Sequence, residues 1–210
     1  MKRLGAVLVM ALILGACSTA SVDKTQARRV VGSESGVRID AEIFGELMRT
    51  GSPIPITYEI TNGRSERIAV ADIIPVTSWD PEELMVTVDI GSEVPGEVLL
   101  PRLVAIEPGE TKVFSTSARI AFAIPPAAGQ RPPAVSLRLK VNFLGDVEPF
   151  RALLGITEKA VADRALADAL FPLWIERNEA LYTGTVTMRW STTRDPAVGP
   201  VPRSPRTGRF

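Results

Sequence analysis

Apolar and polar residues alternate along much of the chain between Val37 and Phe143. The alternation is strict over residues 37–43, 54–60 and 135–143, where every second residue is apolar. A period of two is typical of β-strands that bury one face. Less regular apolar segments predict further strands at residues 68–74, 84–90, 98–106, 111–123 and 182–190. Many short strands at this spacing predict an all-β fold, an immunoglobulin-like β-sandwich of about seven to eight strands.

The core of the sandwich is expected to form from the apolar faces of the two clearest strands. Six residues lie on these faces: Ile56, Tyr58, Ile60, Leu137, Leu139 and Val141. Because the strands bury one face each, all six side chains should be shielded from water.

The period changes from two to about 3.6 residues between residues 146 and 176. Asp146 is a candidate cap for a short helix over residues 147–154, which Gly155 follows. Thr157 is a candidate cap for a second helix, which we expect to end near Leu170, before Pro172. These features predict a helical hairpin inserted before the last strand of the sandwich.

Aromatic residues gather at the end of this predicted insertion. Phe171 and Trp174 stand in a dense apolar cluster, and such clusters usually belong to a core. We therefore expect Phe171 to pin the insertion onto the sandwich. The alternative is a partly exposed patch that docks a protein partner. We expect part of Trp174 to be exposed for that purpose.

The first seventeen residues have the pattern of an export signal. Lys2 and Arg3 form a basic head, and residues 4–16 are an unbroken apolar run. Thirteen apolar residues are too few to span a bilayer comfortably. The run ends at Cys17, which is the only cysteine of the chain.

The sequence Leu14-Gly15-Ala16-Cys17 resembles the lipobox of bacterial lipoproteins. The resemblance implies that residues 1–16 are removed and that Cys17 carries acyl chains holding the protein to a membrane. The residue after the cysteine is Ser18, and in this position the chain resembles lipoproteins sent to the outer membrane. We therefore expect the protein to lie at the outer membrane and to face the periplasm. The alternative is an ordinary cleaved signal with its cleavage site near Ala16 or Ala20.

The rest of the chain is expected to divide into three parts. Residues 17–36 are polar and small and predict a flexible tether. Residues 37–191 predict the sandwich with its insertion at residues 146–176. Residues 192–210 contain four prolines and four arginines and predict a disordered tail.

Two segments resemble strands of bacterial immunoglobulin-like domains. They are Gly51–Asn62, which ends in asparagine, and Leu103–Phe114, which contains a Pro-Gly turn. The resemblance supports the fold class, and it carries no active site.

Composition excludes several classes of function. The chain has no histidine, which excludes Ser-His-Asp catalysis and histidine-ligated metals. A single cysteine excludes an intramolecular disulfide. Without residues 1–16 the chain has 22 basic and 24 acidic side chains, a net charge of −2, which argues against binding nucleic acid.

Acidic residues remain as the candidates for chemistry. Asp80, Glu82 and Glu83 lie close together, and Asp89 and Glu93 flank a glycine. Neither spacing matches a calcium-binding loop, so we predict no metal site and no cofactor. No Gly-rich phosphate loop is present, and no small-molecule substrate is evident.

These observations favour a non-enzymatic binding or scaffolding module of the cell envelope with an envelope protein as its partner. One alternative is an inhibitor or chaperone-like binder that offers a sheet edge to a secreted protein. A further alternative is a hydrolase that uses acidic residues alone.

Overall fold

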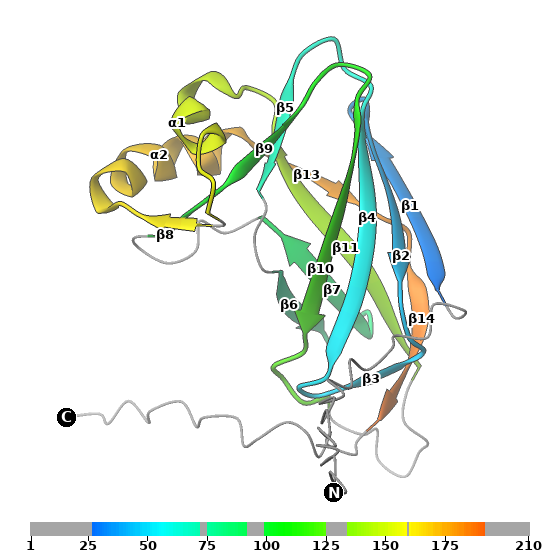
Figure 1. Ribbon diagram of the computed structural model, residues 1–210. Helices are drawn as coiled ribbons and strands as arrows, with labels where there is room; N and C mark the ends of the chain where they lie inside the picture. The colour runs from blue at the N-terminus through cyan, green and yellow to red at the C-terminus, as the bar shows by residue number, and fades with distance from the viewer. Residues whose placement is uncertain (1–26, 72–74, 92–98, 125–133, 159, 192–210) are drawn as a thin grey trace, which may run out of the picture.

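The computed structural model describes residues 27–71, 75–91, 99–124, 134–158 and 160–191. They form two large β-sheets packed face to face, with helices and a small two-stranded sheet at one end (Figure 1). Sheet A is antiparallel throughout. Its strands, in order across the sheet, are β1 (Arg28–Glu34), β2 (Val37–Ile43), β4 (Pro53–Asn62) and β10 (Thr111–Arg119). The predicted all-β sandwich is confirmed.

Sheet B is built around the long strand β11 (Ala134–Leu144). One side of β11 pairs with two strands that follow the helices, and the other side pairs with β7 in parallel and then with β5. The other strands of this sheet are β3 (Leu47–Arg49), β5 (Ile68–Ala71), β6 (Val76–Asp80), β7 (Met85–Ile90), β9 (Leu103–Ile106), β13 (Asn178–Tyr182) and β14 (Val186–Ser191). The single strand predicted over residues 98–106 is instead β8 (Leu99–Pro101) and β9, because the pairing partner changes at Arg102.

The main core fills the space between the two sheets. The six residues expected there are all buried, with exposed fractions of 2% or less. On β4 and β11 every second side chain enters this core. Burial of one face on each strand is the reason that the period of two was so clear in the sequence.

The helical insertion packs on the outer face of sheet B. It consists of the 3-10 helix η2 (Glu148–Phe150), α1 (Arg151–Leu154), the short strand β12 (Ala160–Ala162) paired with β8, and α2 (Arg164–Arg177). A second apolar cluster lies beneath these elements and includes Ala69 and Ala71 of β5, Leu144, Phe150 and Trp174. Since β5 is buried on both faces, it joins the two cores. Among the described residues, no helix is long and apolar enough to cross a membrane.

The predicted second helix differs from α2 at both ends. Asp163, and not Thr157, is the N-cap, and its carboxylate accepts a hydrogen bond from the backbone N–H of Leu166 at 3.0 Å. The helix also continues through Pro172 to Arg177. Pro172 leaves the carbonyl of Asp168 without its usual donor, but both residues are exposed. Water can therefore replace the missing hydrogen bond.

The predicted tether over residues 17–36 is wrong from Arg28 onward. Residues 28–34 form β1, which pairs with β2 along its whole length. The side chain of Arg29 also forms an ion pair with Asp40 of β2. Residues 17–26 and the predicted tail over residues 192–210 lie outside the described residues.

A close crossing of backbones holds β1 against the opposite sheet. Gly184 donates its N–H to the carbonyl of Val31 at 2.9 Å. A Cβ atom at Gly32 would overlap the backbone carbonyl of Tyr182. This position therefore requires glycine, because there is no room for a side chain.

Replacing Gly32 by alanine should lower the free energy of unfolding by about 1–3 kcal/mol, because the backbones must separate. Urea unfolding would measure the loss. Gly155→Ala is the matched control, since a Cβ there meets no atom within 4 Å and the φ of Gly155 is −86°. Equal stability of the two variants would contradict the docking of β1.

A buried polar cluster lies where β11 changes partner from β7 to β5. Asn142 is 2% exposed, and its side-chain amide donates to the carboxylate of Asp89 at 2.7 Å and to the carbonyl of Ile90 at 3.0 Å. Lys140 forms an ion pair with the same carboxylate at 2.8 Å. The amide oxygen of Asn142 accepts from Asn178 at 3.1 Å. The cluster satisfies polar groups at the end of β7 that no strand covers.

Candidate functional site

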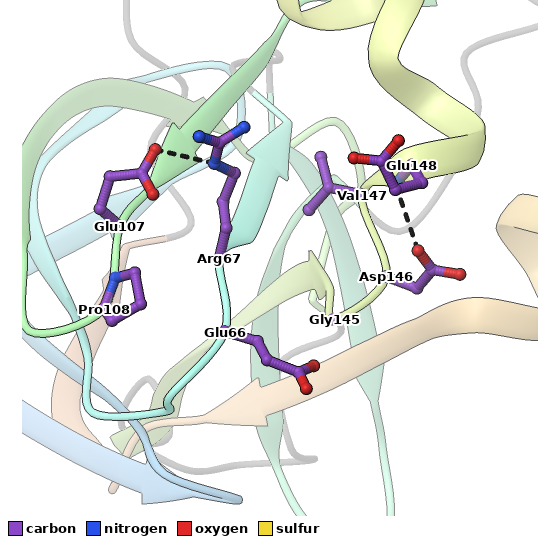
Figure 2. A pocket seen from close by; sticks show the side chains of 8 residues that line it. All are labelled: Glu66, Arg67, Glu107, Pro108, Gly145, Asp146, Val147 and Glu148. Carbon is purple, nitrogen blue, oxygen red and sulfur yellow. Dashed lines mark hydrogen bonds and ion pairs between the residues drawn. The ribbon is translucent and has the colours of Figure 1, made fainter.

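Three loops meet at the end of the sandwich near the helices and form an open cleft with a volume of about 490 Å³. The loops are the β4–β5 connection, the β9–β10 turn and the segment between β11 and η2. The cleft is lined by Glu66, Arg67, Glu107, Pro108, Gly145, Asp146, Val147 and Glu148 (Figure 2). Four of the eight lining residues are acidic, so the cleft favours a cation or a basic side chain.

Most of the carboxylates in the cleft already have partners. Arg67 contacts Glu107 at 2.7 Å, and Figure 2 shows this pair on one side of the cleft. Asp146 accepts from the backbone N–H of Glu148 at 3.2 Å and forms an ion pair with Arg177 of α2. Because these side chains are largely exposed, the ion pairs contribute little to stability.

Two carboxylates outside the cleft hold their negative charge more strongly than usual. A glycosidase needs a carboxyl group that keeps its proton near neutral pH. Beside the cleft, a hydrogen bond from the backbone N–H of Glu107 lowers the pKa of Glu110. On sheet A, the hydrogen bond from Arg29 likewise lowers the pKa of Asp40. Both shifts are opposite to those of a general acid.

Two of the acidic residues noted in the sequence, Asp80 and Asp89, have structural partners. Asp80 accepts from the backbone N–H groups of Glu82 and Glu83, at 3.0 and 3.2 Å, and so closes the β6–β7 turn. Asp89 belongs to the buried cluster around Asn142. Glu93 lies outside the described residues. Within the described ranges, no group of three or more His, Cys, Asp or Glu side chains is arranged to hold a metal ion.

The two aromatic candidates lie in the reverse of their expected positions. Trp174 is 2% exposed and packs edge-to-face against Phe150, with 5.7 Å between ring centroids. Phe171, which was expected to pack inward, is 49% exposed. The expectation of a partly exposed Trp174 is therefore wrong. The buried face of α2 carries Ala167, Leu170 and Trp174, at helical spacing from the Asp163 cap.

Ile175 was not identified from the sequence as a candidate for docking. It is 63% exposed and lies four residues after Phe171. Residues four apart share a face of a helix, so the two side chains lie next to each other on the outer side of α2. We call this pair the α2 apolar pair. The i, i+4 spacing was visible in the sequence, but which face of the helix is exposed was not.

Cys17, the predicted lipidation residue, lies outside the described residues. A search with protein-family models finds no match for this chain, and a search of curated proteins finds no match either.

Proposed function

We propose that this protein is a lipid-anchored lipoprotein of the cell envelope that acts as a non-enzymatic binding or scaffolding module. The observation that carries the proposal is the N-terminal sequence, in which a basic head and an apolar run end at Leu14-Gly15-Ala16-Cys17. We further propose that the acyl chains on Cys17 hold the protein at the outer membrane, where it faces the periplasm. The single cysteine fits this role, since no other thiol competes for modification.

The direction in which the chain enters the sandwich supports this proposal. Arg28 begins β1 beside the carbonyl of Thr187 and next to Glu46, which also pairs with Arg189. At the other end of β1, roughly 20 Å away, the carbonyl of Ser35 accepts from Arg64. Arg64 also pairs with Glu179, close to Gly145, where the helical insertion begins.

The helices therefore lie at the end of the sandwich opposite the point of entry. Ten residues separate Cys17 from Arg28, and ten residues span at most about 35 Å when fully extended. An anchor at Cys17 would keep the entry end near the membrane. The cleft and the α2 apolar pair would then be at the end that is free to meet a partner.

The α2 apolar pair is the surface that we propose for docking an envelope protein. Phe171 and Ile175 are both largely exposed, whereas the neighbouring Trp174 belongs to the core. Exposed neighbouring apolar side chains favour contact with another protein. The proposed docking surface therefore consists of Phe171 and Ile175 and does not include Trp174.

Replacing Cys17 by serine should abolish the incorporation of labelled palmitate and release the protein from the membrane fraction or leave its signal uncleaved. The reason is that a hydroxyl group cannot form the thioether to which the lipid is attached. Metabolic labelling followed by membrane fractionation would measure both effects. Ser18→Ala is the control and should be labelled normally. Equal palmitate labelling of the Cys17→Ser protein and the wild type would reject the lipid anchor.

The double replacement Phe171→Ser and Ile175→Ser should reduce crosslinking to a partner in intact cells while leaving the free energy of unfolding nearly unchanged. Exposed side chains contribute little to folding but can dominate binding. Val76→Thr is the control, because Val76 is 48% exposed but lies on β6. If both proteins retain the same crosslinked products, the α2 apolar pair is not the docking surface.

A further inference from the structure

Strand β10 is an edge strand of sheet A. All nine of its residues pair with β4 on one side, and no other strand of the described residues pairs with its second side (Figure 1). At the opposite edge, β1 accepts a hydrogen bond at Val31 from Gly184, which lies between β13 and β14. Sheet A therefore presents one edge that another strand can extend.

The pairing with β4 determines which backbone groups face the open side. Asn62 donates its N–H to the carbonyl of Glu110 at 3.0 Å. Because hydrogen-bonded pairs alternate along an antiparallel ladder, the even-numbered residues of β10 bond to β4. The backbone groups of Val113, Ser115 and Ser117 then point away from β4. In agreement, the carbonyl of Arg119 accepts a hydrogen bond from the side chain of Thr77, outside the ladder.

The middle of this edge lacks the features that usually prevent strands from associating. Natural edge strands are protected by proline, by bulges or by charged side chains. Residues 113–118 contain no proline, no glycine and no charge, and Val113 is 62% exposed. The two cations of β10 lie near its ends, and Lys112 is turned toward the carbonyl of Ala105 at 2.7 Å.

We propose that β10 pairs with β10 of a second copy of this chain, antiparallel and centred on Ser115. In this register Val113 lies opposite Ser117 of the second copy, and Thr111 lies opposite Arg119. Each hydrogen-bonded pair then uses backbone groups that point to the open side in both copies. At the two outermost pairs the carbonyl of Arg119 already accepts from Thr77, so only the N–H of Arg119 takes part there. No like charges face each other, which would otherwise oppose pairing. The two copies form one continuous sheet through a two-fold, self-complementary contact.

Disulfide trapping tests the register. The full chain carrying Cys17→Ser has no other cysteine, so Ser115→Cys introduces the only thiol. Directly opposed residues in a hydrogen-bonded pair have Cα atoms about 5.5 Å apart, which suits a disulfide. Mild oxidation in detergent solution should link two chains. Ser33→Cys, at an exposed position of β1 in the same sheet, is the control and should link far less.

Sedimentation analysis of the full chain in detergent tests the association itself. We expect a dimer that Ser115→Lys weakens by roughly fivefold or more, because like charges meet at the two-fold axis. Ser115→Pro should also abolish dimers, since it removes an N–H that β4 does not use. A monomeric parent protein would overturn the proposal, even if β10 were found to bind an extended segment of another protein. Disulfide formation no greater than that of the Ser33→Cys control would also overturn it.

Discussion

Replacing Trp174 by alanine is expected to lower the free energy of unfolding by about 3–5 kcal/mol. The indole is 2% exposed and lies in the second apolar cluster against Phe150. Its Nε1 atom has no hydrogen-bond partner in the described structure, so truncation removes packing and leaves a cavity without breaking a polar contact. Urea unfolding followed by circular dichroism would measure the change.

Phe171→Ala is the matched control on the same helix. Because Phe171 is 49% exposed, we expect this replacement to change the free energy of unfolding by about half a kcal/mol or less. The difference in the free energy of unfolding between the two variants tests directly which face of α2 packs against the sheet. A larger loss at Phe171 than at Trp174 would mean that the helix turns its other face to the sheet.

Replacing Asn142 by aspartate should cost about 3–5 kcal/mol, comparable to breaking a buried ion pair. The amide now donates two hydrogen bonds, one of them to the carboxylate of Asp89 at 2.7 Å. A carboxylate at this position donates none and places a second negative charge beside Asp89. The charge of Asp89 then raises the pKa of the introduced carboxyl. The variant should therefore recover part of its deficit relative to wild type as the pH falls and one carboxyl binds a proton.

The exchanged pair, Asp89→Asn with Asn142→Asp, is the control for this replacement. It keeps one carboxylate and one amide in the cluster and leaves Lys140 a negative partner nearby. We expect it to be more stable than Asn142→Asp alone, with a favourable coupling energy in a double-mutant cycle. If the two carboxylates of the single variant cause no loss at neutral pH, Asn142 is not the buried hydrogen-bond donor described above.

Much of the sandwich could be predicted because its central strands bury one face each. The alternation over β2, β4 and β11 reflects contacts with the opposite sheet, and the six predicted core residues are buried there. The position of the helices between β11 and the last strands was also predictable from the change of period. Local sequence patterns were therefore sufficient to predict the two-layer sandwich and the position of its helices.

The location of β1 could not be read from its own residues. Its only buried side chain is Val30, so no alternation marks the strand. What holds β1 in place is the ladder with β2, the ion pair of Arg29 with Asp40 and the close approach of Gly32 to Tyr182. The contact with Tyr182 joins residues distant in sequence, and a polar segment of this kind resembles a tether.

The site was harder to predict than the fold for a related reason. The expected helix ended near Leu170, but α2 continues to Arg177, so Trp174 falls on the buried face and Phe171 on the outer face. The cleft brings together Glu66, Glu107 and Asp146 from three separate loops. They lie close together because of how the two sheets pack, and no local sequence pattern predicts this.

The proposed lipid anchor is tested most directly by mass spectrometry of the N-terminal peptide from protein purified out of membranes. If Cys17 carries the lipid, residues 1–16 are absent and Cys17 is the first residue, with the added mass of a diacylglyceryl group and, where present, an N-linked acyl chain. An unmodified N-terminus beginning after Ala16 or Ala20, or an intact N-terminus beginning at Met1, would contradict it.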